Sequence, residues 1–224
     1  MQDLNTNRII ETLSLERIEA YQQDGASNET ALTRYTWNMA LCQSLYPSLQ
    51  LCEISLRNSI HFHLTKAYGE QWFDCTQLTL TPWGQNQVKQ AKELLSRMKK
   101  PITPGRVVAE LQFGFWTHLL ESHYEGSLGY LPKGIKGIFP HLPKSEHNRK
   151  KLKAKLDKIR GLRNRVFHHE RIIHWKDLRE QHALILTMIN NISPDTKTLC
   201  DKLDSFADLH SNGYDKCLKQ DIKQ

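Results

Sequence analysis

The residues best suited to chemistry lie in one short run, 162–170, with the sequence Leu-Arg-Asn-Arg-Val-Phe-His-His-Glu. It places Arg163, Asn164 and His168 within six residues. An imidazole transfers protons near neutral pH, and a guanidinium stays charged and can grip a phosphate with two parallel hydrogen bonds. An amide can hold the imidazole in one tautomer or bind a ribose hydroxyl. Together these groups suffice to cleave RNA without a metal ion.

The order of several short segments gives this run a family resemblance. Arg163 and His168 match the pattern of arginine, four to six residues and histidine found in HEPN ribonucleases, and the fuller string Leu-Arg-Asn-x-x-x-His-His-Glu is similar to their bacterial Abi-like (abortive-infection) branch. The resemblance covers roughly residues 14 to 190. Four further segments are similar to that branch in the same order: Tyr-Thr-Trp-Asn at 35–38, Glu-Ile-Ser-Leu-Arg-Asn at 53–58, Tyr-Gly and Trp-Phe within 68–73, and Phe-Gly-Phe-Trp at 113–116.

The resemblance implies a fold, an activity and an assembly. The fold is expected to be an all-α, single-domain, HEPN-like helical bundle over residues 1–210, with a frayed polar tail at 211–224. The activity is that of a metal-independent endoribonuclease of a bacterial anti-phage system, acting as a homodimer whose paired motifs form one cleft. His168 moves protons, Arg163 stabilises charge on the phosphate, and Asn164 positions the imidazole or the ribose. His169 is the second choice for the imidazole, and no cofactor is expected.

The positive charge of the chain is concentrated beside this motif. The formal net charge is +7, but residues 133–179 hold fifteen Lys/Arg and four Asp/Glu, which leaves sixteen and twenty elsewhere. Phosphate contacts supply most of the nonspecific affinity for nucleic acids, so this basic block favours RNA as a partner. A solvated lysine-rich helix face is the alternative. The predicted RNA-binding residues are Lys150, Lys151, Lys153, Lys155, Lys158, Arg160 and Arg165.

The periodicity of the basic segment bears on where Arg163 points. On an ideal helix Arg163 falls on the apolar stripe that includes Leu152 and Ile159, where an unpaired charge is costly. We therefore expect either a carboxylate partner inside the fold or a cleft that receives an anion. Arg163 and His168 lie about 140° apart, which a helix end near His168 or a second subunit would relieve. A structural arginine–glutamate pair with a helix-terminal histidine is the non-catalytic alternative.

A second polar group is predicted on one face of an earlier helix. Glu53, Arg57 and His61 recur every four residues, with Asn58 beside them. A second catalytic motif is one interpretation, because Leu-Arg-Asn occurs in both places. The favoured interpretation is support: Glu53 neutralises Arg57 or reaches a cationic partner on the basic helix.

Cysteine, histidine and apolar patterns argue against several other classes of protein. The five cysteines are odd in number and form no C-x-x-C pair, so they predict free thiols in a reducing cytoplasm. The histidine spacings do not bring imidazoles together around one ion, and no metal site is predicted. The first residues resemble no signal peptide, and no apolar run approaches the roughly 18 residues that span a bilayer. We expect a cytoplasmic protein without a membrane partner.

Hydrophobic periodicity predicts helices through nearly the whole chain. Residues 126–143, rich in glycine and proline, are expected to form an ordered loop. The expected helices cover Leu15–Tyr21 after a Ser14 cap, 28–46 and 48–67 on either side of Pro47, 85–99, a helix from Thr103-Pro104 to Leu119, a basic helix capped by Ser145, 178–192, and a short helix from Ser193-Pro194 to about Leu209.

Two other functions remain open at this point. The chain is alternatively a non-catalytic RNA-binding module that holds a small regulatory RNA, or a protein-interaction subunit of a toxin–antitoxin pair. RNA products with 2′,3′-cyclic phosphate and 5′-hydroxyl ends separate the ribonuclease from both. Salt-sensitive RNA binding without cleavage selects the first alternative, and the lack of RNA affinity selects the second.

Overall fold

The described fold is entirely helical. The computed structural model describes residues 5–22, 25–126 and 133–213, and no strand occurs in these ranges. This confirms the all-α class, while residues 214–224 of the expected tail lie outside the described residues. The α-helices of these ranges are α1 (Thr6–Leu13), α2 (Leu15–Glu19), α3 (Asn28–Tyr68), α4 (Pro82–Arg97), α5 (Pro104–Glu110), α6 (Phe113–His118), α7 (Lys133–Ile138), α8 (Arg149–Phe167), α9 (Leu178–Ile192), α10 (Pro194–Leu203) and α11 (Phe206–Asn212). Three 3₁₀ helices are η1 (Trp72–Asp74), η2 (Ser122–Tyr124) and η3 (Lys144–Glu146).

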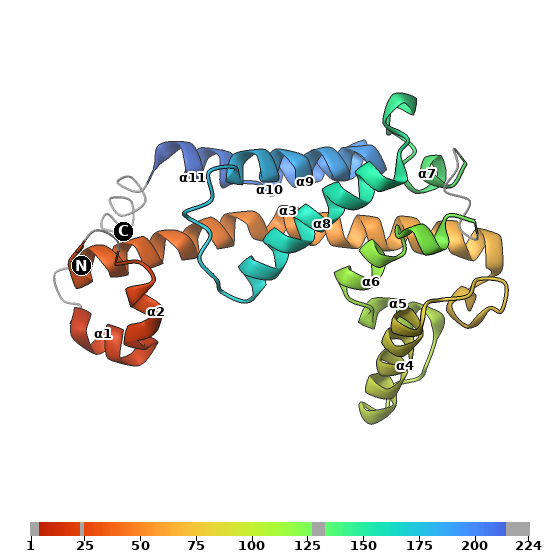
Figure 1. Ribbon diagram of the computed structural model, residues 1–224, viewed down its shortest axis with the longest axis horizontal. Helices are drawn as coiled ribbons and strands as arrows, with labels where there is room; N and C mark the ends of the chain where they lie inside the picture. The colour runs from red at the N-terminus through yellow and green to blue at the C-terminus, as the bar shows by residue number, and fades with distance from the viewer. Residues whose placement is uncertain (1–4, 23–24, 127–132, 214–224) are drawn as a thin grey trace.

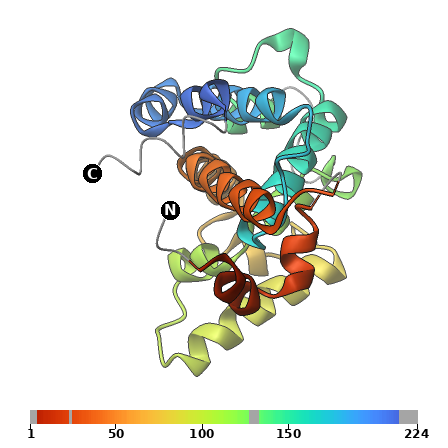
Figure 2. The ribbon, with the colours of Figure 1, turned by 90° about the vertical axis from the view of Figure 1, so that its left-hand side faces the viewer.

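The long helix α3 is the axis of the molecule (Figure 1). It is 41 residues long, and α9, α10 and α11 form a layer along one side of it while α8 crosses it obliquely. The short helices α1 and α2 pack near its beginning, and α4, α5 and α6 lie towards its other end. Figure 2, which looks nearly along α3, shows neighbouring helices on several sides of this axis.

Two apolar clusters hold the helices together. In the larger one, Leu45 and Leu56 of α3 are fully buried with Leu156 and Ile159 of α8 and Ile185 of α9. Removal of this apolar surface from water is the main force that keeps α8 on α3. A smaller cluster joins the first two helices to the beginning of α3 and consists of Ile10, Ile18, Tyr21, Ala31 and Leu32.

The prediction that Pro47 interrupts the first long helix is wrong. Pro47 lies inside α3, which continues through it. A proline in a helix removes one hydrogen bond to the residue four positions back. Here that residue is Gln43, which is exposed. The buried Leu45 and Leu49 hold the chain on both sides of the proline, and their burial outweighs the local cost.

The predicted helix from Pro104 to Leu119 is also wrong, because it is two helices. The chain turns extended at Leu111, where ψ is 123°, and this residue separates α5 from α6. The indole N–H of the buried Trp116 donates to the Leu111 carbonyl at 3.1 Å. That bond gives the broken helix end a partner that only the tertiary fold supplies. The expected helix up to Leu209 is likewise two helices, because the chain is divided at Asp204 into α10 and α11.

The start of the basic helix and the loop before it differ from prediction as well. Asn148 caps α8 by accepting the Lys151 amide at 2.9 Å, whereas Ser145 lies in η3. Asparagine and serine are nearly equivalent N-caps, so composition could not separate them. Part of the expected loop forms α7. There Gly137 lies so close to α3 that a Cβ atom would clash with the ring of His63.

Other elements match their predictions closely. Helix α9 has the expected bounds, and α4 buries Val88, Ala91 and Leu95. Ser14 caps α2, its hydroxyl accepting the Arg17 amide at 3.4 Å. These elements are the ones whose ends and inward faces are set by neighbouring residues in the chain.

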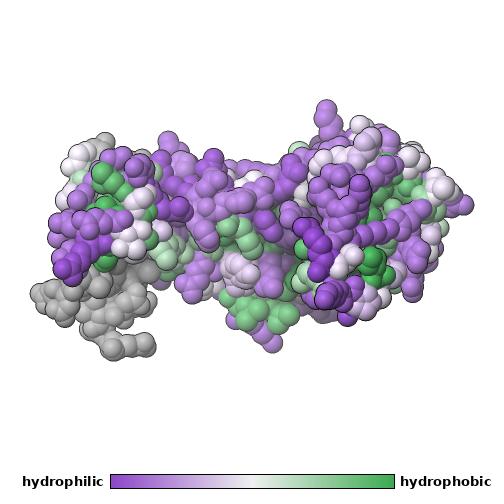
Figure 3. Space-filling view, turned by 90° about the horizontal axis from the view of Figure 1, so that it is seen from below, coloured by the Kyte–Doolittle hydropathy of each residue, from purple (hydrophilic) through white to green (hydrophobic). Residues whose placement is uncertain are grey.

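The surface is largely polar. Figure 3 shows one face of the molecule, mostly hydrophilic with separate hydrophobic areas. None of the described helices combines the length and the apolar character needed to cross a lipid bilayer. Large exposed apolar side chains on α3 include Met39, Tyr46 and Phe62. Met39 and Tyr46 are seven residues apart and therefore lie on one face of the helix.

Candidate functional site

Helix α8 carries the candidate motif at its end and is anchored by a buried stripe. The helix ends at Phe167, and His168 is its C-cap residue. The stripe has the helical spacing expected from the sequence, so the orientation of the basic helix is confirmed. The buried residues of α8 are Leu152, Leu156, Ile159, Leu162 and Val166.

The chain leaves α8 through a Schellman turn. The amide of His169 donates to the Val166 carbonyl at 3.2 Å, and the amide of Glu170 donates to the Arg165 carbonyl at 2.8 Å, which are the two bonds of this helix ending. His169 has a φ of 58° and occupies the left-handed position that glycine usually fills. His168 and His169 are both exposed. The helix end therefore presents two neighbouring imidazoles to solvent.

Side chains from α3 and α2 fix the segment that follows this turn. The buried Asn38 accepts the amides of Ile172 at 2.7 Å and of the next residue at 3.3 Å, and it donates to the Glu170 carbonyl at 3.2 Å. Arg17 donates to the His169 carbonyl at 2.7 Å. Asn38 is thus a positioning residue for the end of α8, a role that its place in the Tyr-Thr-Trp-Asn segment did not reveal.

Arg163 is held by a carboxylate and by an aromatic ring. Its Nε donates to Glu53 Oε2 at 3.1 Å, and its guanidinium lies 4.3 Å from the ring centroid of Phe167. The side chains of Arg163 and Glu53 are 23% and 21% exposed. Of the two alternatives for Arg163, the structure shows the carboxylate partner inside the fold, and of the two for Glu53 it shows the cation on the basic helix. This pair, with His168 at the helix end, is also the arrangement expected of the non-catalytic alternative. The Arg163 side chain is thus partly exposed, which leaves room for an anion to reach it.

The second polar group does not assemble into a site of the same kind. The Nε of Arg57 donates to Asn58 Oδ1 at 3.2 Å. His61 Nδ1 accepts the indole N–H of Trp72 at 2.9 Å, which ties α3 to η1. Partial burial, and then the charge of Arg57, lowers the pKa of His61. His61 Nδ1 is therefore engaged as the acceptor of a bond between two elements, while Glu53 contacts Arg163 of the basic helix.

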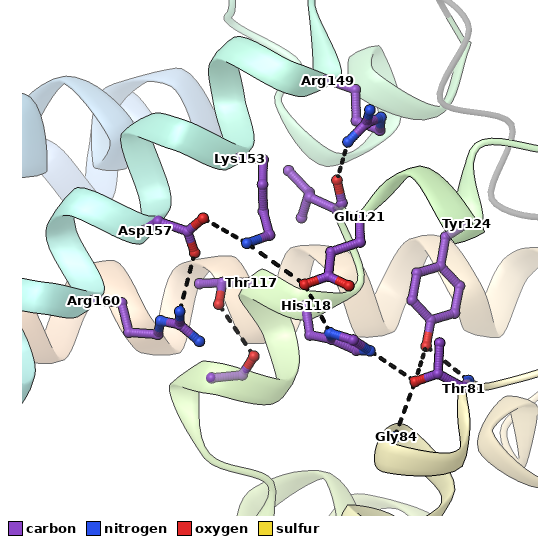
Figure 4. A network of polar contacts seen from close by, with 12 residues as sticks. Thr81, Gly84, Thr117, His118, Glu121, Tyr124, Arg149, Lys153, Asp157 and Arg160 are labelled. Atoms are coloured by element: carbon purple, nitrogen blue, oxygen red, sulfur yellow. Dashed lines mark hydrogen bonds and ion pairs between the residues drawn. The ribbon is translucent and has the colours of Figure 1, made fainter.

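Five of the seven predicted RNA-binding residues are paired with carboxylates. Lys153 lies 2.5 Å from Asp157 and 3.8 Å from Glu121, and Arg160 lies 3.4 Å from the other oxygen of Asp157 (Figure 4). These ion pairs neutralise much of the charge that the sequence concentrates on α8. The remaining pairs are Lys155–Glu146 at 2.8 Å, Lys158–Asp177 at 2.6 Å and Arg165–Glu170 at 2.8 Å.

Two lysines of the first turn differ from the others. Lys150 and Lys151 are exposed and form no ion pair with any described residue. They stand at the positive end of the helix dipole, which adds to their own charge. Arg149 beside them is tied to Glu125 at 2.8 Å. The charge available to a polyanion on α8 is therefore concentrated at Lys150 and Lys151.

The network in Figure 4 joins α8 to α6 and α4 and has the outline of a catalytic relay. Thr81 Oγ1 lies 2.8 Å from His118 Nε2, and His118 Nδ1 lies 3.0 Å from Glu121 Oε1, the order of groups in a nucleophilic triad. However, Thr81 Oγ1 also accepts the Gly84 amide at 3.2 Å as the N-cap of α4, and the Tyr124 hydroxyl at 3.3 Å. Because the Thr81 hydroxyl already accepts these two hydrogen bonds, it is not a free nucleophile. Its role is to connect the start of α4 with Tyr124 and His118.

A small, mostly apolar pocket opens beside the end of α8. Its volume is about 290 Å³. The ring of Tyr46 stacks on that of Phe167 with 5.2 Å between centroids. Apart from His169, no lining residue was predicted as a site residue, although Met39 and Tyr46 have the spacing of one helix face. The lining residues are Tyr35, Asn38, Met39, Cys42, Gln43 and Tyr46 of α3, with Val166, Phe167 and His169.

The part of the chain that the structure describes contains no metal site, and the comparisons gave no match. Among the described residues, no group of three His, Cys, Asp or Glu side chains is placed to hold a metal ion, and the four cysteines in these ranges are free. Comparisons with protein-family models, with curated proteins and with solved structures gave no match to this chain. The resemblance to HEPN ribonucleases therefore rests on the order of the sequence motifs.

Proposed function

We propose that this chain is a metal-independent endoribonuclease, similar to the HEPN ribonucleases of bacterial abortive-infection systems, and that it acts in the cytoplasm. One observation carries the proposal: the end of α8 presents the exposed imidazoles of His168 and His169 just over one turn after a partly open Arg163. Glu53 holds the guanidinium, and the Schellman turn fixes the backbone that carries the two histidines. Charged and proton-transferring groups fixed before the substrate arrives are what such catalysis requires.

In the proposed reaction the ribose 2′-hydroxyl attacks the adjacent phosphorus and the 5′-oxygen leaves. His168 accepts the proton of the hydroxyl or donates one to the leaving oxygen. Arg163 stabilises the negative charge that gathers on the phosphate oxygens. The exposed Asn164 orients the imidazole or the ribose. The products carry a 2′,3′-cyclic phosphate and a 5′-hydroxyl, and no metal or cofactor takes part.

The proposed enzyme is a homodimer with composite sites. Arg163 points towards α3, where Glu53 holds it, while His168 caps the helix end and is exposed. Two imidazoles, one as base and one as acid, are most easily supplied by two chains whose helix ends face one another. A small regulatory RNA or a protein antitoxin would control such an enzyme by covering this cleft.

The first test is cleavage of RNA by the Arg163→Ala and His168→Ala variants. Each change should lower the rate at least about 100-fold, the range observed when a charge stabiliser or a proton-transfer group is lost. Cleavage by the wild type should persist in EDTA, and mass spectrometry should identify cyclic phosphate ends. Full activity of both variants, or activity lost in EDTA and restored by a divalent ion, contradicts the assignment.

A companion variant separates the imidazole of His169 from its backbone role. His169→Gly keeps the left-handed position that the turn requires, whereas an alanine at this position would strain it. Reduced cleavage by a His169→Gly protein with unchanged thermal stability would assign the imidazole of His169 to the reaction. Unchanged cleavage would leave His168 as the acting imidazole.

The assembly is tested by mixing two inactive proteins. Arg163→Ala and His168→Ala should complement one another in part, because some heterodimers then hold one intact composite site. Sedimentation should show a dimer. A monomer that remains fully active at nanomolar concentration would exclude composite sites.

RNA binding without cleavage by the wild type would instead identify an RNA-binding module, and no RNA affinity would identify a protein-interaction subunit.

A further inference from the structure

The pocket beside the end of α8 shares a wall with the proposed catalytic group. Phe167 contacts Arg163, whose guanidinium is 4.3 Å from the ring centroid, and it contacts Tyr46, whose ring stacks on it at an interplanar angle of 28°. His169 lines the pocket and follows His168 in the chain. A substrate that reaches the proposed catalytic residues is therefore adjacent to this pocket.

The lining of the pocket suits an uncharged, flat group. None of its nine lining residues is Asp, Glu, Lys or Arg, so the pocket holds no fixed charge that would neutralise a phosphate. Met39 and Tyr46 are 54% and 48% exposed, which leaves apolar surface in water for a ligand to cover. The Tyr46 ring stacks on Phe167 and is still about half exposed, so a second ring can cover it.

The size of the pocket and its polar side chains narrow the choice of ligand. At about 290 Å³ it is at the small end of ligand sites and has room for one heterocycle but not for a helix. Gln43 and His169 are exposed, and their side chains form no hydrogen bond with a described residue. Both carry donors and acceptors that can contact the edge of a base. Asn38, in contrast, uses its amide to hold the backbone.

We propose that this pocket binds one nucleobase of the RNA substrate, from a nucleotide that flanks the scissile phosphate. The base stacks on Tyr46, Gln43 contacts its edge, and the phosphate stays outside the pocket near Arg163. The inference rests on the proposed RNA cleavage and adds its specificity site. Stacking on aromatic side chains is the usual way in which proteins bind unpaired RNA bases. Cleavage should therefore require single-stranded RNA and prefer one base at one position.

Base stacking can be measured apart from cleavage. The probe is a short oligoribonucleotide with 2-aminopurine at one of the two nucleotides flanking the mapped cut, bound to the inactive His168→Ala protein. We expect its fluorescence to be quenched at one of these positions. Adding Tyr46→Ala should remove the quenching and weaken binding about tenfold to a hundredfold. Phe62→Ala is the matched control, because Phe62 is an aromatic residue of the same helix that is 70% exposed and lies outside the pocket.

A second variant protects the result against loss of folding. Gln43→Ala removes the proposed contact with the base edge while leaving Tyr46 on Phe167, and it should reduce the base preference without lowering the thermal stability, because Gln43 is exposed. A wild type that cleaves RNA, with quenching and base preference unchanged in both variants, overturns the base pocket alone. A wild type that cleaves no RNA overturns the proposed function and this inference with it. Dissociation of the dimer by Tyr46→Ala, with no quenching at either position, identifies the pocket as a subunit contact and also overturns the inference.

Discussion

The middle of α8 and its C-terminal end carry similar charge in the sequence but lie in different surroundings. In the middle, Lys153 and Arg160 share Asp157, and Lys158 is 2.6 Å from Asp177. At the end, His168 and His169 are exposed, and the pocket next to them contains no fixed charge. The cations in the middle of the helix are thus neutralised by carboxylates, as are Arg163 and Arg165 near its end, while the imidazoles at the end remain exposed.

This difference shows why the net charge counted along a sequence segment overstates the electrostatic potential at the surface of the folded protein. Residues 133–179 hold fifteen Lys/Arg against four Asp/Glu. Three carboxylates from outside this block nevertheless reach into it: Glu121 meets Lys153, Glu125 meets Arg149, and Glu53 meets Arg163. Partly buried pairs of this kind position side chains more than they attract distant phosphates.

The largest expected effect comes from releasing the end of α8. Asn38→Ala removes the acceptor of the buried Ile172 amide and the donor to the Glu170 carbonyl. Unsatisfied buried groups of this kind should lower the free energy of unfolding by about 2–4 kcal/mol. Urea titration measures the change, and cleavage should fall with it even at temperatures where the variant is folded. Asn58→Ala is the matched control on the same helix, because Asn58 is exposed and bonds only Arg57. Equal stability of the two variants would show that the turn does not depend on Asn38.

A smaller effect is expected when unpaired and paired lysines of α8 are compared for their contribution to RNA binding. Lys150→Gln with Lys151→Gln should weaken RNA binding and reduce the slope of log affinity against log salt by about 1.4, the value for two contacts to single-stranded RNA. Lys153→Gln with Lys155→Gln removes the same formal charge, but from side chains already paired with Asp157 and Glu146. This second pair of changes should alter the slope much less. Equal slopes in the two variants would mean that ion pairing within the fold does not limit RNA contact.

Local signals decided which parts of the fold could be predicted. The bounds of α9 and the inward face of α4 follow from the spacing of apolar residues. The helical wheel placed Arg163 on the buried side of α8 and predicted either a carboxylate partner or a cleft for an anion, and the fold supplies the carboxylate of Glu53. The sequence left two partners open for Glu53, namely Arg57 on the same helix and a cation on the basic helix. Only the packing of α8 on α3 decides between them.

Tertiary contacts decided the parts that sequence could not predict. Pro47 continues a helix because buried leucines hold both sides of it, and Leu111 ends one because the Trp116 indole bonds its carbonyl. The pocket was not predicted because Tyr46 and Phe167 are far apart in the chain and meet only when α8 crosses α3. The periodicity of the sequence predicts which face of a helix a residue lies on. It does not predict which other helix packs against that face, because this depends on the whole fold.

A buried pair between α9 and the end of α10, outside the proposed site, separates pH effects on the fold from pH effects on chemistry. His182 of α9 lies 2.6 Å from Asp204 Oδ2, and both side chains are buried. Burial lowers the pKa of His182 below its ordinary value of 6.5, and this outweighs the opposing effect of Asp204. The unfolded chain therefore binds a proton on this residue more readily than the folded chain does. The free energy of unfolding should be highest above about pH 6.5 and should fall as the pH is lowered through that value.

The smallest expected effect is the change in this pH dependence in His182→Gln. The variant should lose part of the decline in stability between about pH 7 and pH 5, measured by urea titration at each pH. A residual decline should remain, because partial burial also lowers the pKa of His61 and of His174. If cleavage by the wild type falls on acidification and this fall persists in His182→Gln, it belongs to the proposed proton transfer at the end of α8. A fall that disappears in the variant belongs to the fold, and acid sensitivity would then say nothing about His168.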